Sequence, residues 1–229
     1  MPKQLRAKKF RRVNELLRDY YGPVGDHSGA PLDTLIRTIL SQNTTDVNSI
    51  PAFERLREHF GGDWERALEA GPEAIEEQIE QAGLAPTKSR RIHAILRELK
   101  QQRGELSLQH ICEMEPEEAE AYLLDFPGVG PKTAAIVLLF DCEMPFFPVD
   151  THVHRIAKRL SWIDEKDDAV RTYEILTEAV PEELHYPLHL NLVRHGRETC
   201  RPSRPDCNAC PISRFCEAYR SGEVEPRES

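Results

Sequence analysis

A short helix-breaking segment, residues 126–130 (FPGVG), separates two runs with helical periodicity. The first run ends at Leu124, and the apolar run that follows opens at Pro131, a residue favoured at the first position of a helix. The pattern predicts two helices joined by a tight glycine hairpin. Glycines let a backbone approach a partner closely, and amides at a helix N-terminus bind phosphate, but such short motifs are also typical of a helix-helix turn without a ligand.

Two charged residues follow this hairpin. Lys132 falls in the first turn of the second predicted helix, where the helix dipole and the apolar hairpin both favour the neutral, nucleophilic amine. A solvated lysine near a phosphate is the simpler alternative. Asp150 precedes another helical run and is a typical N-cap, whose backbone hydrogen bonds favour the ionised carboxylate. An ionised carboxylate suits the stabilisation of positive charge better than proton donation, so the two roles are compatible.

Helix-forming residues dominate the rest of the chain, and strand-like alternation is scarce, so the predicted fold class is all-α. Its 229 residues, with 39% hydrophobic and 30% charged residues, are typical of a globular protein that buries a good core. No apolar run approaches the roughly 18 residues needed to span a membrane. The basic start of the chain contains Glu15 and Asp19, so we interpret it as the first helix of the fold and not as a transit peptide.

Four cysteines near the C-terminus form a metal-ligand pattern, Cys200-x6-Cys207-x2-Cys210-x5-Cys216. Disulfides would require an export signal, which we do not find, so thiolate coordination is favoured. Four thiolates suit zinc, but a single C-x2-C knuckle with wide spacers also suits a [4Fe-4S] cluster. The other two cysteines, Cys112 and Cys142, are expected to be buried hydrophobic residues.

The segments 126–134 (FPGVGPKTA) and 148–155 (PVDTHVHR) together resemble the helix-hairpin-helix DNA glycosylases, in particular the endonuclease III branch. The resemblance covers nearly the whole chain, and the cysteine spacing matches the cluster motif of that family. It implies that Lys132 is the nucleophile, that Asp150 is its catalytic partner, and that the four cysteines hold a [4Fe-4S] cluster. The expected architecture is two helical domains, residues 31–143 and residues 1–30 with 144–229, the second closed by the cluster.

The same resemblance implies a set of DNA contacts. In the segment 41–46 (SQNTTD), an amide side chain fills the gap left by a flipped base. Asn43 aligns with that position and Gln42 is one place away, so both stay open. Leu84 is the expected wedge in the base stack, although a buried leucine is the alternative. The other expected contacts are Lys88, Arg90, Gly128, Val129, Gly130 and His152.

The resemblance therefore predicts a bifunctional DNA glycosylase and AP lyase that excises oxidised pyrimidines from double-stranded DNA containing damaged bases or abasic sites. We expect a cytoplasmic, nucleoid-associated monomer. The net charge of −9 opposes DNA binding, but basic residues are concentrated in 3–18 and 88–103, which permits a basic face. This charge and Asn43 leave a second hypothesis, a protein that binds abasic or distorted DNA with weak or no glycosylase activity.

Overall fold

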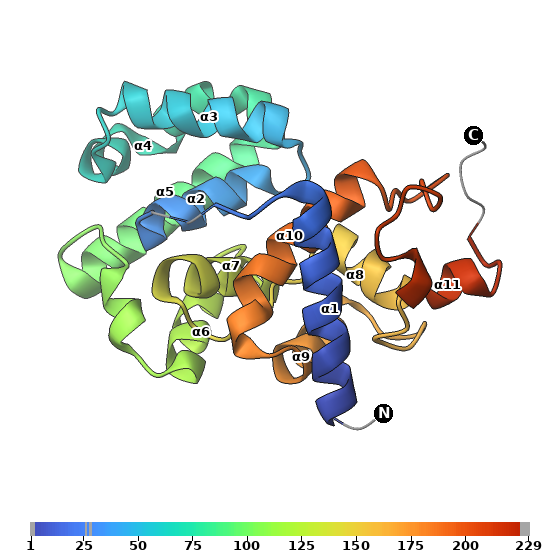
Figure 1. Ribbon diagram of the computed structural model, residues 1–229. Helices are drawn as coiled ribbons and strands as arrows, with labels where there is room; N and C mark the ends of the chain where they lie inside the picture. The colour runs from blue at the N-terminus through green and yellow to red at the C-terminus, as the bar shows by residue number, and fades with distance from the viewer. Residues whose placement is uncertain (1–2, 26, 28, 225–229) are drawn as a thin grey trace. The chain divides into compact units, whose positions relative to one another are not determined.

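The computed structural model describes residues 3–25, 27 and 29–224 (Figure 1). Every regular element in this part of the chain is a helix, and no strand occurs in it, which confirms the all-α class. None of the helices within these ranges is both long enough and apolar enough to cross a bilayer.

The chain divides into two compact units. One comprises Ser28–Met144, and the other comprises Met1–His27 with Pro145–Ser229.

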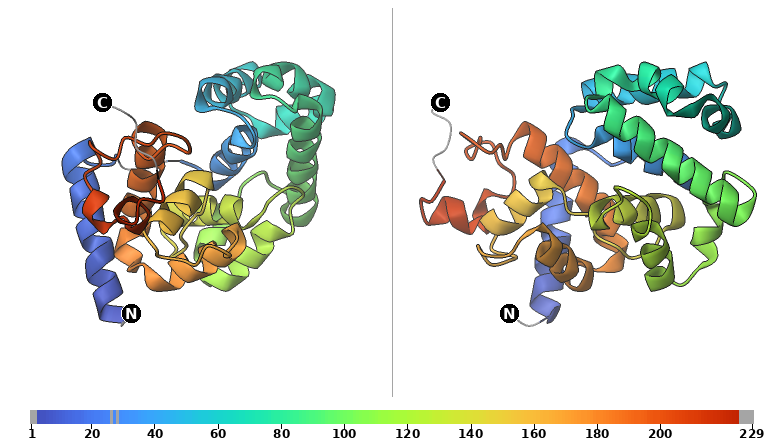
Figure 2. Two further views of the ribbon diagram at one scale, coloured as in Figure 1. Left: turned by 90° about the vertical axis from the view of Figure 1, so that its right-hand side faces the viewer. Right: turned by 180° about the vertical axis from the view of Figure 1, so that it is seen from behind.

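The unit Ser28–Met144 is built around a buried helix, α2 (Pro31–Ser41), which packs against α3 (Asp46–His59), α5 (Ala85–Arg103) and α7 (Pro131–Cys142). Helix α4 (Trp64–Ile79) is kinked at Gly71, which has φ +86° and is followed by Pro72. Helices α4 and α5 pack against each other (Figure 2). The remaining elements of this unit are η1 (Glu80–Ala82), η2 (Gln109–Glu113) and α6 (Pro116–Leu124).

The other unit packs α1 (Lys3–Tyr21) against α10 (His185–Glu198). The apolar stripe of α1 is buried there, with Val13 and Leu17 fully excluded from solvent and Phe10 in edge-to-face contact with Trp162. The remaining elements are α8 (Thr151–Arg159), α9 (Ala169–Ala179), η3 (Glu182–Leu184), η4 (Ser213–Phe215) and α11 (Glu217–Arg220).

One sequence prediction about cysteine is wrong. Cys112 and Cys142 are not unpaired buried residues: they form a disulfide, with their Cα atoms 4.8 Å apart. Both are half-buried, and the bond joins η2 to the last residue of α7. Thirty positions separate them in the sequence, so no local spacing pattern indicated the pair.

Candidate functional site

The glycine hairpin joins α6 to α7, and its two glycines differ in what they require. Gly128 has φ +80°, and a Cβ placed there would lie 2.6 Å from Cδ of Arg91. Gly130 has φ −114°, and a Cβ placed there would meet no atom within 4 Å. Backbone conformation and packing therefore both demand glycine at position 128, whereas neither does at position 130.

The hairpin also leaves backbone donors available. Val129 is buried, and its amide donates to the carbonyl of Phe126 over 3.1 Å. The amides of Gly128 and Gly130 make no hydrogen bond within the described part of the chain. Free amides that precede a helix N-terminus are suited to bind an anion.

Lys132 is the second residue of α7 and is half-buried. The next three residues of the same helix, Thr133 to Ala135, are buried. Since α7 also packs along α2, the lysine is carried by a rigid helix and not by a loop.

The structure separates the roles of Gln42 and Asn43. Nε2 of Gln42 donates to the carbonyl of Gly128 over 3.1 Å and to Oγ1 of Thr133 over 3.4 Å, and Oε1 accepts from Arg91 over 3.3 Å. Asn43 is exposed and adopts a left-handed conformation, with φ +53°. Gln42 is thus held against the hairpin, while Asn43 is an exposed residue.

Leu84 occupies a second left-handed position. It precedes α5 with φ +53°, and 58% of the residue is exposed, which is unusual for a leucine. The alternative that Leu84 is a core residue does not fit this exposure.

Lys88 is where the structure departs from the expected DNA contacts. The residue is only 1% exposed, and Nζ donates to the carbonyls of Leu40 and Ala82, each over 2.8 Å. Burial, together with the nearby charge of Arg91, lowers the pKa of Lys88. Its ammonium group is therefore not at the surface for a phosphate to reach, contrary to the sequence prediction. Arg90 is exposed on the same helix.

Asp150 caps α8, as the sequence predicted. Its Oδ1 accepts a hydrogen bond of 2.7 Å from the amide of Val153, and the residue is half-buried. His152 packs closely against Gly196 of α10, where a Cβ would lie 2.6 Å from the Cβ of the histidine. Nη2 of Arg155 lies 3.1 Å from Nδ1 of His152, so the imidazole is fixed between α8 and α10.

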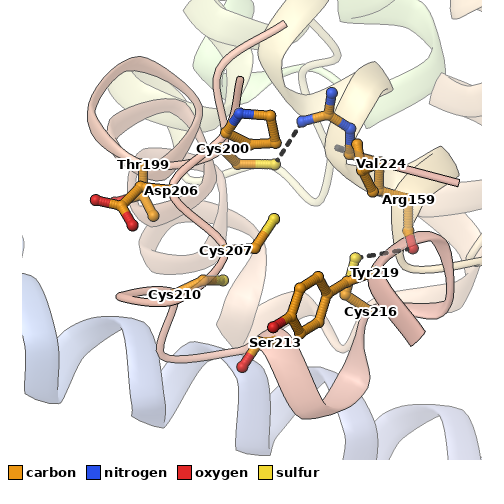
Figure 3. Close-up of a pocket in the computed structure, with 11 residues that line it drawn as sticks. Arg159, Thr199, Cys200, Asp206, Cys207, Cys210, Ser213, Cys216, Tyr219 and Val224 are labelled. Atoms are coloured by element: carbon orange, nitrogen blue, oxygen red, sulfur yellow. Dashed lines mark hydrogen bonds between the residues drawn. The ribbon is translucent and has the colours of Figure 1, made fainter. Parts of the chain in front are cut away.

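The four C-terminal cysteines line one cavity, and none of them forms a disulfide (Figure 3). Burial raises the pKa of Cys210 to about 12, and it also raises the pKa of Cys207 and of Cys216. Buried thiolates require a positive partner, so this donor set fits a thiolate-bound metal centre. Among the described residues, however, no three His, Cys, Asp or Glu side chains are arranged to hold a metal ion.

Cationic side chains of α8 attach the cysteine segment to the helix that Asp150 caps. Arg155 donates through Nη2 to the carbonyl of Cys200 over 2.9 Å. Arg159 donates to Sγ of Cys200 over 3.1 Å, and its backbone carbonyl lies 3.3 Å from Sγ of Cys216 (Figure 3). Neither arginine belongs to the cysteine motif, so its spacing pattern gave no indication of these contacts.

A second set of contacts joins the cysteine segment to α1. The hydroxyl of Tyr21 lies 2.9 Å from Nδ1 of His195 and 2.6 Å from Oγ1 of Thr199, and Nε2 of the histidine lies 3.5 Å from Sγ of Cys210. Burial lowers the pKa of His195 to about 4, so the ring is neutral at pH 7. Helices α1 and α10 of this unit therefore meet beside the cysteines.

Sequence comparisons relate the chain to base excision DNA repair proteins. Residues 36–182 match the model of the HhH-GPD superfamily of base excision DNA repair proteins. The chain is 38% identical to endonuclease III of Thermotoga maritima over 86% of its own length and 89% of that protein. It is 42% identical over 72% of its length to a putative DNA glycosylase of Arabidopsis thaliana, At3g47830, and spans 56% of that relative.

Solved structures show the same fold. An endonuclease III in a non-covalent complex with DNA superposes with a TM-score of 0.79 at 24% identity, over 97% of this chain and 99% of that one. A thermostable thymine-DNA glycosylase superposes with a TM-score of 0.75 at 20% identity, over 93% of this chain and 98% of that one. The chain therefore belongs to the HhH-GPD superfamily of base excision DNA repair proteins, within its endonuclease III-like DNA glycosylases.

Proposed function

We propose that the protein is a bifunctional DNA glycosylase and AP lyase that excises oxidised pyrimidines from duplex DNA. The observation that carries the proposal is Lys132, a lysine in the first turn of α7 directly after a hairpin in which two amides make no hydrogen bond to any residue that the structure describes. Glycosylases that only hydrolyse the base need no amine at this place, whereas a lyase does. The similarity of the chain to the endonuclease III of Thermotoga maritima supports the same assignment.

The proposed reaction begins with a damaged nucleotide rotated out of the stack, because C1' is unreachable inside the duplex. The neutral amine of Lys132 attacks C1', the bond from C1' to the base breaks, and the base leaves with a proton. The sugar ring opens to a Schiff base on Nζ. Loss of a C2' proton then eliminates the 3' phosphate and cuts the strand.

Asp150 is proposed to stabilise the positive charge that develops on the sugar. Its carboxylate accepts a hydrogen bond from the amide of Val153, an arrangement that suits an electrostatic role better than proton donation.

The proposed DNA contacts follow from exposure and from free donors. The amides of Gly128 and Gly130 would bind backbone phosphate, and the exposed Arg90 would add an electrostatic contact. Asn43, and not Gln42, would fill the gap left by the flipped base, because only the amide of Asn43 is free of the hairpin. Leu84 would enter the stack beside it.

We expect Cys200, Cys207, Cys210 and Cys216 to hold a [4Fe-4S] cluster with a structural role, supported by four free thiols around one cavity. When bound, the cluster supplies the positive charge that the buried thiolates need. Protein purified without air should be yellow-brown and contain about four irons per chain by elemental analysis. A colourless protein with stoichiometric zinc would contradict this assignment.

A substrate panel tests the proposed activity. Duplexes that contain thymine glycol, 5-hydroxycytosine, 8-oxoguanine or an abasic site are incubated with protein, and the products are separated with and without alkali. The proposal predicts strand cleavage without alkali at the two oxidised pyrimidines and at the abasic site. Cleavage only after alkali would indicate a glycosylase without lyase activity. Tight binding to the abasic duplex without any cleavage would favour the binding-protein hypothesis.

Leu84→Ala should slow excision of thymine glycol from duplex about tenfold or more, because the wedge offsets an unstacking cost of a few kcal/mol. Strand cleavage at a preformed abasic site should change little, since no base remains to be extracted. Single-turnover rates on both substrates provide the measurement. Val170→Ala, another exposed apolar residue, serves as control and should leave both rates unchanged.

Equal losses on both substrates would argue against a wedge. Because Leu84 is exposed, its truncation should change the free energy of unfolding by no more than about 0.5 kcal/mol. A marked loss of stability would mean that Leu84 is a packing residue in solution.

The two hairpin glycines give a matched pair of variants. Gly128→Ala should lower the free energy of unfolding by about 1–3 kcal/mol, because alanine is strained at φ +80° and its Cβ would displace Arg91. Gly130→Ala should leave stability unchanged but weaken binding to an abasic-site analogue, since the methyl group would obstruct a phosphate at the hairpin. Chemical denaturation and DNA titration measure the two effects. Wild-type DNA affinity in Gly130→Ala would show that DNA does not approach there.

A further inference from the structure

Lys88 is a buried cation whose position surface binding does not explain. It lies in the first turn of α5, where the positive end of the helix dipole disfavours an ammonium group. Its two acceptors are the carbonyl of Leu40, in the last turn of α2, and the carbonyl of Ala82, which ends η1. These are the negative ends of two helical segments, so the ammonium group is held by acceptors that favour it.

Each acceptor lies just before a turn to which we assign a DNA contact. Ala82 precedes residues 83–84, the Leu84 turn, and Leu40 is separated by one residue from residues 42–43, the Asn43 turn. The backbone amide of Lys88 also binds the Leu84 turn from its other side, since it donates to the carbonyl of Leu84 over 3.0 Å. One residue thus contacts the Leu84 turn on both sides and the end of the helix that leads to Asn43.

Both turns need such support because each contains a residue in a conformation that L-amino acids rarely adopt. Asn43 and Leu84 both have φ +53°, and both are exposed. Exposed turns with unfavourable backbone conformations persist only when their surroundings hold them. One helical turn beyond Lys88, Arg91 extends the same support by donating to Gln42.

We propose that Lys88 is a positioning residue that holds the Leu84 turn and the Asn43 turn together as one unit, so that wedge and gap filler enter the base stack at a fixed separation. The inference rests on the proposed function, because the DNA roles of Leu84 and Asn43 are part of it. It assigns Lys88 to base flipping, not to binding of phosphate and not to the chemistry at C1'.

The test uses Lys88→Met, which keeps the length of the side chain but loses the ammonium group, in the full chain. Duplexes carry an abasic-site analogue with 2-aminopurine opposite or beside it, and the fluorescence of this base reports its loss of stacking at saturating protein. Excision from duplex and cleavage at a preformed abasic site are measured in parallel. Lys100→Met, an exposed lysine on the same helix that pairs with Glu65, is the control.

For Lys88→Met we expect the fluorescence increase to be largely lost and excision to slow at least tenfold, while abasic-site cleavage stays within threefold of wild type. Lys88→Arg, which keeps donors for both carbonyls, should recover most of the signal. If Lys88→Met does not fold, Lys88→Gln takes its place in the same comparison. A wild-type signal in Lys88→Met, or equal losses in excision and cleavage that track the folded fraction, would overturn the proposal.

A double variant gives a readout that a merely structural role would not move. If Lys88 acts through the Leu84 turn, Leu84→Ala should slow excision much less in the Lys88→Met background than in wild type. Independent, multiplicative losses would contradict the proposal. The fluorescence change in the wild-type complex requires binding but no catalysis. The substrate panel therefore tests the glycosylase assignment, and the comparison of fluorescence between wild type and Lys88→Met tests the Lys88 proposal separately.

Discussion

Replacing Lys132 with glutamine is expected to abolish covalent trapping of the protein on DNA by borohydride. An imine between Nζ and C1' would be reduced to a stable amine, so wild type should form an adduct with duplexes that contain thymine glycol or an abasic site. Glutamine keeps a polar side chain of similar length but has no nucleophilic amine. Strand cleavage should fall on the order of a thousandfold or more, as expected when the residue that forms the covalent bond is removed.

Binding and folding controls make this result interpretable. Lys132 is half-buried at the start of α7, so the substitution should leave thermal stability and affinity for an abasic-site analogue close to wild type. Lys100→Gln removes an exposed lysine elsewhere and should trap like wild type. An adduct of normal yield with Lys132→Gln would show that another amine is the nucleophile. Absence of any wild-type adduct would exclude the Schiff-base mechanism.

Asp150→Asn is expected to slow excision by about 100- to 1000-fold, the usual cost of removing one electrostatic stabiliser of a transition state. Asparagine is as good an N-cap as aspartate, so the bond to the amide of Val153 and the stability of α8 should survive. Single-turnover excision and thermal unfolding are measured on the same preparation. The excision rate reports the loss of the charge, and the unfolding temperature reports any loss of the helix cap.

Asp150→Ala supplies the complementary comparison, since it removes the charge and the cap together. Its free energy of unfolding should fall by about 1 kcal/mol, while excision should slow as in Asp150→Asn or somewhat more. If Asp150→Asn excises at the wild-type rate, the residue is only a helix cap. If its stability falls as far as that of Asp150→Ala, the two effects are not separated and the electrostatic role loses its support.

Local signals predicted the parts of the candidate site that depend on neighbouring residues. Asp150 before a helical run indicated an N-cap, and the bond to Val153 confirms it. Pro131 after the glycine hairpin indicated the start of a helix, and α7 begins at this residue. Each signal concerns backbone bonds within a few residues, so the sequence contains the whole interaction.

The contacts that sequence reasoning missed join segments far apart in the chain. Forty-eight positions separate Lys88 from Leu40, and 86 separate Gln42 from Gly128. Cys112 and Cys142 likewise lie on different elements. Whether a lysine is exposed or is buried with its ammonium group hydrogen-bonded depends on which carbonyls the packed helices place around it. The residues next to Lys88 in the sequence do not indicate these acceptors.

By itself, the sequence determined the helical class, the glycine hairpin with Lys132 after it, the cap at Asp150 and the four-cysteine pattern, because helix periodicity, backbone conformation and ligand spacing are local properties. Tertiary structure alone decided that Gln42 is bonded to the hairpin while Asn43 stays exposed, that Leu84 faces solvent, and that Lys88 is buried. The physical reason is that burial and hydrogen-bond partners depend on how helices pack, so residues with equivalent local signals, such as Gln42 and Asn43, end in different environments.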